Sequence, residues 1–261
     1  MMHSTEPGSF LRAGKLIIHV SASREAMGEA AASEAANRIR ALAAEHETVP
    51  VIFATGESQL STLRALTAKT DLPWNRIVGF HMDEYIGLPE NHPASFRRYL
   101  RENLVQRVSL LRFYEIAGSD GNPRDICREY ADLLRAHKPL LCLLGIGENG
   151  HLAFNDPGEA DFSDPEDVKV VSLDQACRQQ QVNEGWFSDL SEVPRTAVTL
   201  TIPTLLRVPT LIASVPGVRK AHIVKRTLEE PVSTRCPSTI LRTHPGAIAF
   251  LDRESAAEIV P

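Results

Sequence analysis

Short apolar runs alternate with longer stretches of mixed polarity along this chain of 261 residues. Several runs are apolar at consecutive positions, which is typical of strands buried on both faces of a parallel sheet. We predict strands at residues 16–20, 49–54, 76–80, 112–116, 140–144, 168–173, 195–200, 210–215 and 247–251. We predict helices at residues 23–45, 59–68, 95–103, 125–137, 174–186, 202–206, 221–229 and 238–244.

Strands and helices alternate throughout, and no internal repeat or composition break marks a linker. We therefore predict an α/β fold, in which a single-domain doubly wound, mostly parallel sheet carries helices on both faces (Rossmann-like). The domain would span residues 1–261. An apolar content of 43% is ample for a core and excludes a disordered chain.

The stretch from residue 140 to residue 158, LLCLLGIGENGHLAFNDPG, joins the most apolar strand to a polar cluster. Its glycines allow a sharp turn and a close approach of the backbone to a ligand. Ligands of open α/β sheets bind beyond the carboxyl ends of the strands. We expect the catalytic centre at this cluster, which contains Glu148, Asn149, His151, Asn155 and Asp156.

Two other loops have features of an anion site. Thr55-Gly56-Glu57-Ser58 separates a strand from a helix, so free backbone N–H groups, the positive helix end and two hydroxyls would attract phosphate. Lys220 lies near a helix start, where its charge opposes the helix dipole and suits an anion. The alternatives are an ordinary capped turn for the first loop and a surface lysine for the second.

Adjacent carboxylates, Asp83 and Glu84, follow the strand at 76–80. Buried carboxylates are costly unless paired, so one of them is a candidate general base. The alternatives are a solvated acidic loop and, at low rank, a metal fragment with His81, because no second cluster has convincing ligand spacing.

Net charge and the remaining motifs limit the classes of function. A net charge of −5 argues against a nucleic-acid surface, and no apolar run is long enough to cross a membrane. The N-terminus lacks the apolar segment of a signal peptide, so we expect a cytoplasmic protein. Four scattered cysteines favour free buried thiols over disulfides or a zinc site.

The polar loops follow strands of one parallel sheet, so we expect them to converge at the same rim. Together they offer an anion cradle, a lysine, a carboxylate base and a histidine–carboxylate pair. This set favours acid–base chemistry on a sugar phosphate that is isomerised, deaminated or hydrolysed.

Several motifs together resemble the glucosamine-6-phosphate deaminase/isomerase family, which is related to the 6-phosphogluconolactonases. They are FATGES, GFHMDEYIGL with HPASF, GIGENGHLAFNDPG, AVTLTIPTLL and PSTILRTH, and they cover most of the chain. The resemblance implies that glucosamine 6-phosphate and water give fructose 6-phosphate and ammonia, as part of amino-sugar metabolism. It implies no metal and no organic cofactor. The expected partner is a small-molecule amino-sugar phosphate, with no nucleic acid and no membrane, and a homo-oligomer is left open.

The resemblance also assigns roles to residues. Asp83 matches the base that moves a proton from C2 to C1, and His151 matches the acid–base group of ring opening. Asp156 would orient His151, and Asn149 would hold a hydrogen bond in the same relay. The loop from Thr55 to Ser58 and Lys220 would bind the phosphate.

The chain departs from the family pattern in two places. Gln181 stands where the family has a phosphate-binding arginine, and Arg178, one helical turn earlier, is the candidate substitute. Asp167 stands at a position that is basic in the allosteric site of some members, although Lys169 is present. We therefore expect no activation by N-acetylglucosamine 6-phosphate. Two alternatives stay open, a lactonase-like hydrolase and a non-catalytic regulator that binds a sugar phosphate.

Overall fold

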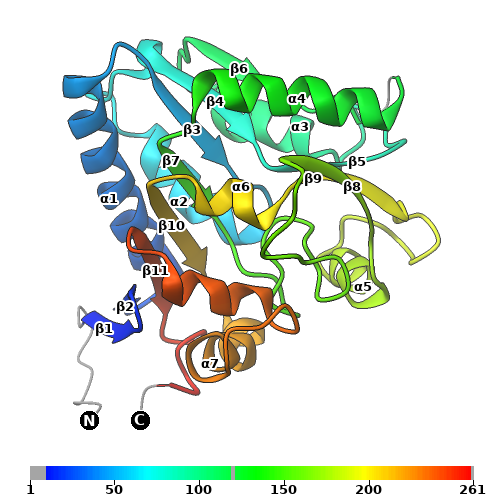
Figure 1. The fold of residues 1–261 in the computed structure, drawn as a ribbon. Coiled ribbons are helices and arrows are strands. Elements are labelled where there is room, and N and C mark those ends of the chain that lie inside the picture. The colour runs from blue at the N-terminus through cyan, green and yellow to red at the C-terminus, as the bar shows by residue number, and fades with distance from the viewer. Residues whose placement is uncertain (1–9, 119–120, 260–261) are drawn as a thin grey trace.

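The computed structural model describes residues 10–118 and 121–259, which form two sheets and their connecting helices (Figure 1). The strands are β1 (Phe10–Ala13), β2 (Leu16–Ser21), β3 (Val49–Phe53), β4 (Ile77–His81), β5 (Asp83–Tyr85), β6 (Arg112–Tyr114), β7 (Leu141–Leu144), β8 (Val168–Ser172), β9 (Thr196–Leu200), β10 (Thr210–Val215) and β11 (Ala247–Asp252). The α-helices are α1 (Arg24–Glu45), α2 (Leu60–Thr67), α3 (Phe96–Leu100), α4 (Pro123–His137), α5 (Gln175–Asn183), α6 (Ile202–Leu206) and α7 (Ala221–Glu229). Short 3-10 turns are η1 (Glu57–Gln59), η2 (Trp74–Arg76), η4 (Val218–Lys220) and η5 (Pro237–Thr243), and η3 (Arg101–Val105) is a π-helical turn that extends α3.

The main sheet has eight strands in the order β1-β2-β11-β10-β7-β3-β4-β6. Every neighbouring pair is parallel except β1 with β2, so the predicted mostly parallel sheet is confirmed. From the centre of the sheet, β3, β4 and β6 follow one another toward one edge, and β7, β10 and β11 follow one another toward the other, with β2 and β1 beyond β11. Two such runs in opposite directions are the arrangement of a doubly wound α/β fold. Strand β1, which was not predicted from the sequence, forms an antiparallel edge.

Helices cover both faces of this sheet, as predicted (Figure 1). Along β3, Val51 and Phe53 pack with α1, α2 and α3, whereas Ile52 packs with α4, α6 and α7 on the other side. Alternate residues of a strand point to opposite faces, so a strand that is covered on both sides must be apolar at every position. This requirement explains the continuous apolar runs in the sequence.

A second, antiparallel sheet of three strands has the order β5-β9-β8. The predicted strands at 168–173 and 195–200 therefore exist but do not join the parallel sheet. Their partner β5 belongs to the acidic segment, which the sequence analysis treated as a loop. This small sheet and α5 enclose a separate apolar cluster around Tyr85 and Phe154.

Candidate active site

Four neighbouring parallel strands, β10, β7, β3 and β4, end at one pocket. The pocket has a volume of about 200 Å³ and is lined by residues from the loops that follow all four strands. The structure therefore brings together the loops whose convergence the sequence predicted. The pocket lies at the carboxyl edge of the sheet, where open α/β sheets bind their ligands.

The loops after β3 and β10 have the same construction. Each leaves its strand through a glycine with positive φ, Gly56 at 94° and Gly217 at 93°, and then enters a short 3-10 turn followed by a helix. A side chain at either position would be strained, because L-residues rarely adopt this conformation. The predicted anion loop, Thr55 to Ser58, and Lys220 both line the pocket.

Lys220 is only 8% exposed, so the alternative of a surface lysine is wrong. It ends the 3-10 turn η4 and precedes α7, with its side chain in the wall of the pocket. Burial lowers the pKa of its ammonium group, because the charged form loses hydration. A bound anion would restore a favourable environment for this charge, which makes Lys220 a suitable phosphate ligand.

A hydrogen-bonded relay holds His151 at the pocket wall. Nδ1 of His151 lies 2.9 Å from Oδ1 of Asp156, and Nδ2 of Asn149 donates to the same oxygen at 2.8 Å. The backbone N–H of His151 donates to Oδ1 of Asn149 at 3.0 Å. Burial alone would raise the pKa of Asp156, but the hydrogen bonds from His151 and Asn149 outweigh burial and lower the pKa. Asp156 therefore stays ionised and fixes the imidazole, whose Nε2 is left for proton exchange.

Gly147 makes room for the imidazole ring of His151. A Cβ atom at this position would overlap Nε2 and Cε1 of His151. The backbone N–H of Gly147 also donates to the carbonyl of His151 at 3.0 Å and closes the loop on itself. The position of the His151 side chain thus requires a glycine at residue 147.

Asp83 is 5% exposed and lines the same pocket, so the solvated-loop alternative is wrong. Its Oδ1 has no hydrogen-bond partner within the part of the chain that the structure describes. Burial, with a smaller contribution from the charge of Glu84, raises its pKa well above the usual range. A carboxylate with a raised pKa is a stronger base, as proton abstraction from carbon requires.

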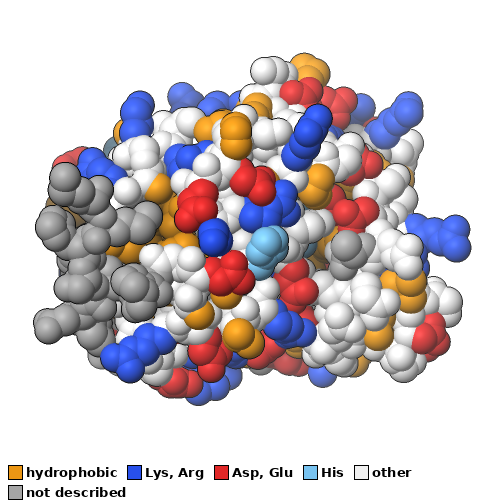
Figure 2. All heavy atoms as spheres, turned by 90° about the horizontal axis from the view of Figure 1, so that it is seen from below, with side chains coloured by type: hydrophobic (Ala, Val, Ile, Leu, Met, Phe, Trp, Pro, Cys, Tyr) orange, Lys and Arg blue, Asp and Glu red, His pale blue; other side chains and the backbone are white. Residues whose placement is uncertain are grey.

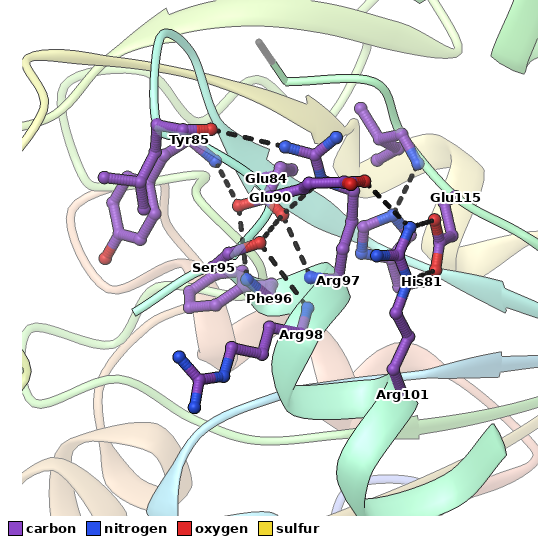
Figure 3. A network of polar contacts seen from close by, with 12 residues as sticks. His81, Glu84, Tyr85, Glu90, Ser95, Phe96, Arg97, Arg98, Arg101 and Glu115 are labelled. Carbon is purple, nitrogen blue, oxygen red and sulfur yellow. Dashed lines mark hydrogen bonds and ion pairs between the residues drawn. The ribbon is translucent and has the colours of Figure 1, made fainter. Parts of the chain in front are cut away.

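Glu84, which is fully buried, is not among the residues that line the pocket and lies in a polar network at the start of α3 (Figure 3). Its Oε2 accepts hydrogen bonds from the Ser95 hydroxyl at 3.0 Å and from Nε of Arg97 at 3.2 Å. The backbone N–H groups of Phe96 and Arg97 also donate to this carboxylate. Glu84 therefore caps the first turn of α3, and the two adjacent acids have separate tasks.

The structure does not bring Arg178 into the pocket. Its guanidinium donates to the backbone carbonyls of Leu190 and Val193 and ties α5 to the following loop. Gln181 does line the pocket. The expectation that Arg178 takes the place of the phosphate-binding arginine is thus corrected, because its side chain is committed on the outer side of α5.

The pocket also contains residues that the sequence analysis did not single out as site residues. Arg24 lies at the start of α1, Arg219 precedes Lys220, Gln180 lies on α5, and Glu184 is the C-cap residue that follows α5. Arg24 follows the helix cap Ser23, and such a position gives no sign that its side chain faces a loop 33 residues away.

One group of side chains has the spacing of metal ligands: His151, Asp156 and Cys177 lie with their donor atoms within 4.8 Å of one another. Burial and the nearby carboxylate of Asp156 raise the pKa of the Cys177 thiol well above its usual value. Thiols bind metals as thiolates, so this environment favours the hydrogen-bonded histidine–carboxylate pair over a metal site. The four cysteines are free and buried, as predicted.

The outer surface shows no large area of one charge on the face seen in Figure 2, where acidic and basic side chains are interspersed. In the described part of the chain, the helices are too short or too polar to cross a membrane.

Comparison with known proteins identifies the family of this chain. Residues 22–250 match the family described as glucosamine-6-phosphate isomerases/6-phosphogluconolactonase. The chain is 33% identical to a glucosamine-6-phosphate deaminase of Exiguobacterium sibiricum over 213 residues, which cover 81% of each protein. It is 34% identical to the enzyme of that name from a Geobacillus species over 215 residues, which are 80% of this chain and 83% of the relative.

Solved structures of similar fold include both branches of the family. A monomeric glucosamine-6-phosphate deaminase superposes with a TM-score of 0.85 at 28% identity and covers 92% of this chain and 99% of its own. The 6-phosphogluconolactonase of Thermotoga maritima has a TM-score of 0.75 at 18% identity, covers 91% of this chain and 99% of its own, and shows the fold alone. This protein is therefore an enzyme that belongs to the glucosamine-6-phosphate isomerase/6-phosphogluconolactonase family.

Proposed function

We propose that this enzyme is a glucosamine-6-phosphate deaminase, which converts glucosamine 6-phosphate and water to fructose 6-phosphate and ammonia in the cytoplasm. The observation that carries the proposal is that Asp83, His151 and Lys220 line one pocket. A base, a proton-exchanging imidazole and an anion-binding ammonium are the groups that this reaction needs. The relatives at 33% and 34% identity, which are named for this activity, support the same choice.

In the proposed reaction, His151 opens the sugar ring. Its Nδ1–H is held by Asp156, so the imidazole presents Nε2 to the substrate and can move a proton between the anomeric hydroxyl and the ring oxygen. Asn149 donates to Asp156 and accepts from the backbone of His151, and it thereby fixes both partners. An amide cannot take up a proton, so Asn149 orients the relay and does not carry the proton.

Asp83 then performs the carbon-acid step. Its carboxylate removes the proton from C2 and returns it to C1, while a second proton passes from the amino group to O1, and the open-chain amino aldose becomes a ketose imine. Water adds to the imine at C2 and ammonia leaves, so atoms and charge balance. The carbonyl or imine of the substrate accepts the electron pair, and the step needs no metal ion or organic cofactor.

The acid pair at β5 favours deamination over lactone hydrolysis. A lactonase needs His151 to activate water, but it has no use for a buried base with a raised pKa. A regulator that only binds a sugar phosphate would need neither Asp83 nor the relay. Keeping Oδ1 of Asp83 buried and unpartnered is costly, and catalysis gives a reason for it.

The test is ammonia release from glucosamine 6-phosphate by the purified protein, with hydrolysis of 6-phosphogluconolactone assayed in parallel. We expect deamination, and we expect Asp83→Asn to lower it by about 10²-fold to 10⁴-fold, the usual contribution of a general base. Asp132→Asn, on an exposed face of α4, is the matched control. Lactone hydrolysis that survives Asp83→Asn, with no ammonia release, would overturn the proposal.

A further inference from the structure

The positive charges that line the pocket lie together beside the loop from Thr55 to Ser58. Among the described lining residues, the basic ones are Lys220, Arg24 and Arg219. They come from separate parts of the fold, because Arg24 begins α1 after β2, whereas Arg219 and Lys220 follow β10. The two arginines are held on the same carboxylate, that of Glu57 within the loop.

The contacts of Glu57 align the two guanidinium groups. Nη1 of Arg24 donates to Oε1 of Glu57 at 2.6 Å, and Nη2 of Arg219 lies 3.8 Å from Oε2. Nε of Arg219 also lies 3.5 Å from Oε1 of Glu148, which follows β7. Each guanidinium has five N–H donors, and the side chains of Arg24 and Arg219 are 38% and 48% exposed, so both keep donors for a ligand.

The part of the pocket wall that α5 and its C-cap residue form contributes no positive charge. Gln180, Gln181 and Glu184 line it, and Nε2 of Gln180 donates to Oε1 of Glu184 at 2.7 Å. Among the described lining residues, the cations that could attract a phosphate dianion are thus Arg24, Arg219 and Lys220.

We propose that Arg24 and Arg219, aligned by Glu57, bind the phosphate of the substrate together with Lys220. This assignment rests on the proposed function, because it names the residues that would fix the phosphorylated end of that substrate. Arginine suits the task, because its planar donors match phosphate oxygens in pairs. With the phosphate anchored beside β2 and β10, the sugar extends toward Asp83 and His151.

The test measures binding of inorganic phosphate by isothermal titration calorimetry, which needs no turnover. We expect Arg24→Gln and Arg219→Gln each to weaken phosphate binding by about 10-fold or more, as for loss of a charge-assisted hydrogen bond. Arg38→Gln is the control, since Arg38 lies on α1 and pairs with Glu34 outside the pocket. With substrate, the two pocket variants should raise KM and change kcat little, whereas a loss of folding would lower the melting temperature and active fraction.

The outcomes separate this proposal from the proposed function. Phosphate binding that is lost in the arginine variants and kept in Arg38→Gln supports the proposed phosphate site, even if no ammonia is released. Phosphate binding that is unchanged in both arginine variants and abolished by Lys220→Gln alone would overturn the proposal that the arginines bind phosphate, even if the enzyme releases ammonia. If a pocket variant does not fold, the lysine variants Arg24→Lys and Arg219→Lys keep the charge, and their full retention of phosphate affinity would contradict the need for paired guanidinium donors.

Discussion

Oδ1 of Asp156 accepts two hydrogen bonds, from Nδ1 of His151 at 2.9 Å and from Nδ2 of Asn149 at 2.8 Å. The ionised shared oxygen favours the imidazole tautomer that carries its proton on Nδ1. A single acceptor atom thus connects His151, which exchanges protons, with Asn149, which orients the pair.

Replacing Asp156 with Asn should disable this relay. The amide can present an N–H to Nδ1, which would favour the tautomer with its proton on Nε2 and remove the negative charge that stabilises an imidazolium. We expect kcat for ammonia release to fall by about 10²-fold or more, with a smaller change in KM. Steady-state kinetics beside Asp132→Asn check this result, and a kcat close to wild type would show that the carboxylate is dispensable.

Gly147→Ala should displace the histidine ring and leave the sheet intact. The new Cβ would lie 2.2 Å from Nε2 and Cε1 of His151. The imidazole ring would therefore have to shift from its place beside Asp156. We expect a loss of kcat of about 10-fold or more, because small misplacements of a reacting group are costly. Gly158→Ala is the matched control, since a Cβ there meets nothing within 4 Å. Equal activity of the two variants would show that His151 does not need the space that Gly147 leaves for its ring.

The parallel sheet and its rim were predictable from the sequence. Strands that are covered on both faces must be apolar at every position, as in β7, so their runs are recognisable without a partner. Once the strands are parallel, the loops after them share an edge, and the convergence of Thr55, Asp83, His151 and Lys220 follows.

The three-stranded sheet and the direction of single side chains were not predictable. β5 has only three residues, and its pairing with β9 depends on tertiary contacts between segments more than 100 positions apart. Arg178 lies on the predicted helix, but a helix position does not say whether its side chain faces the pocket or the loop at Leu190. Likewise, the position of Arg24 as the first residue of α1 does not say that its side chain lines the pocket.

Asp83→Asn should lower activity but make the protein more stable than wild type as the pH rises. Burial raises the pKa of Asp83 in the folded protein above its unfolded value of about 3.9, so the folded state holds the proton more tightly. The stability from this group is therefore fully present below the unfolded pKa and is lost as pH rises through the folded pKa. The asparagine variant should release ammonia about 10²-fold to 10⁴-fold more slowly, and its free energy of unfolding relative to wild type should increase from pH 5 to pH 8. Urea unfolding at both pH values measures the difference, and a difference that decreases would contradict the raised pKa.

The acidic limb of the rate profile should report the same carboxyl group. In the free enzyme, kcat/KM should fall as pH drops through the raised pKa of Asp83, because the protonated group cannot take a proton from C2.

N-acetylglucosamine 6-phosphate should not activate the enzyme. Asp167 is held between Arg135 and Arg207, and Lys169 pairs with Asp164 at 2.8 Å and donates to the carbonyl of Glu159. The basic side chains of this region thus have partners already, and the carboxylate of Asp167 would repel a phosphate. We expect the same kcat/KM and the same hyperbolic rate curve with and without the ligand. Allosteric coupling is typically 1–3 kcal/mol, or about 5-fold to 150-fold in affinity, so initial rates at low substrate concentration would reveal it. A rise of that size in wild type, abolished by Arg135→Gln or Arg207→Gln, would show instead that the ligand displaces Asp167 and takes over its two arginines.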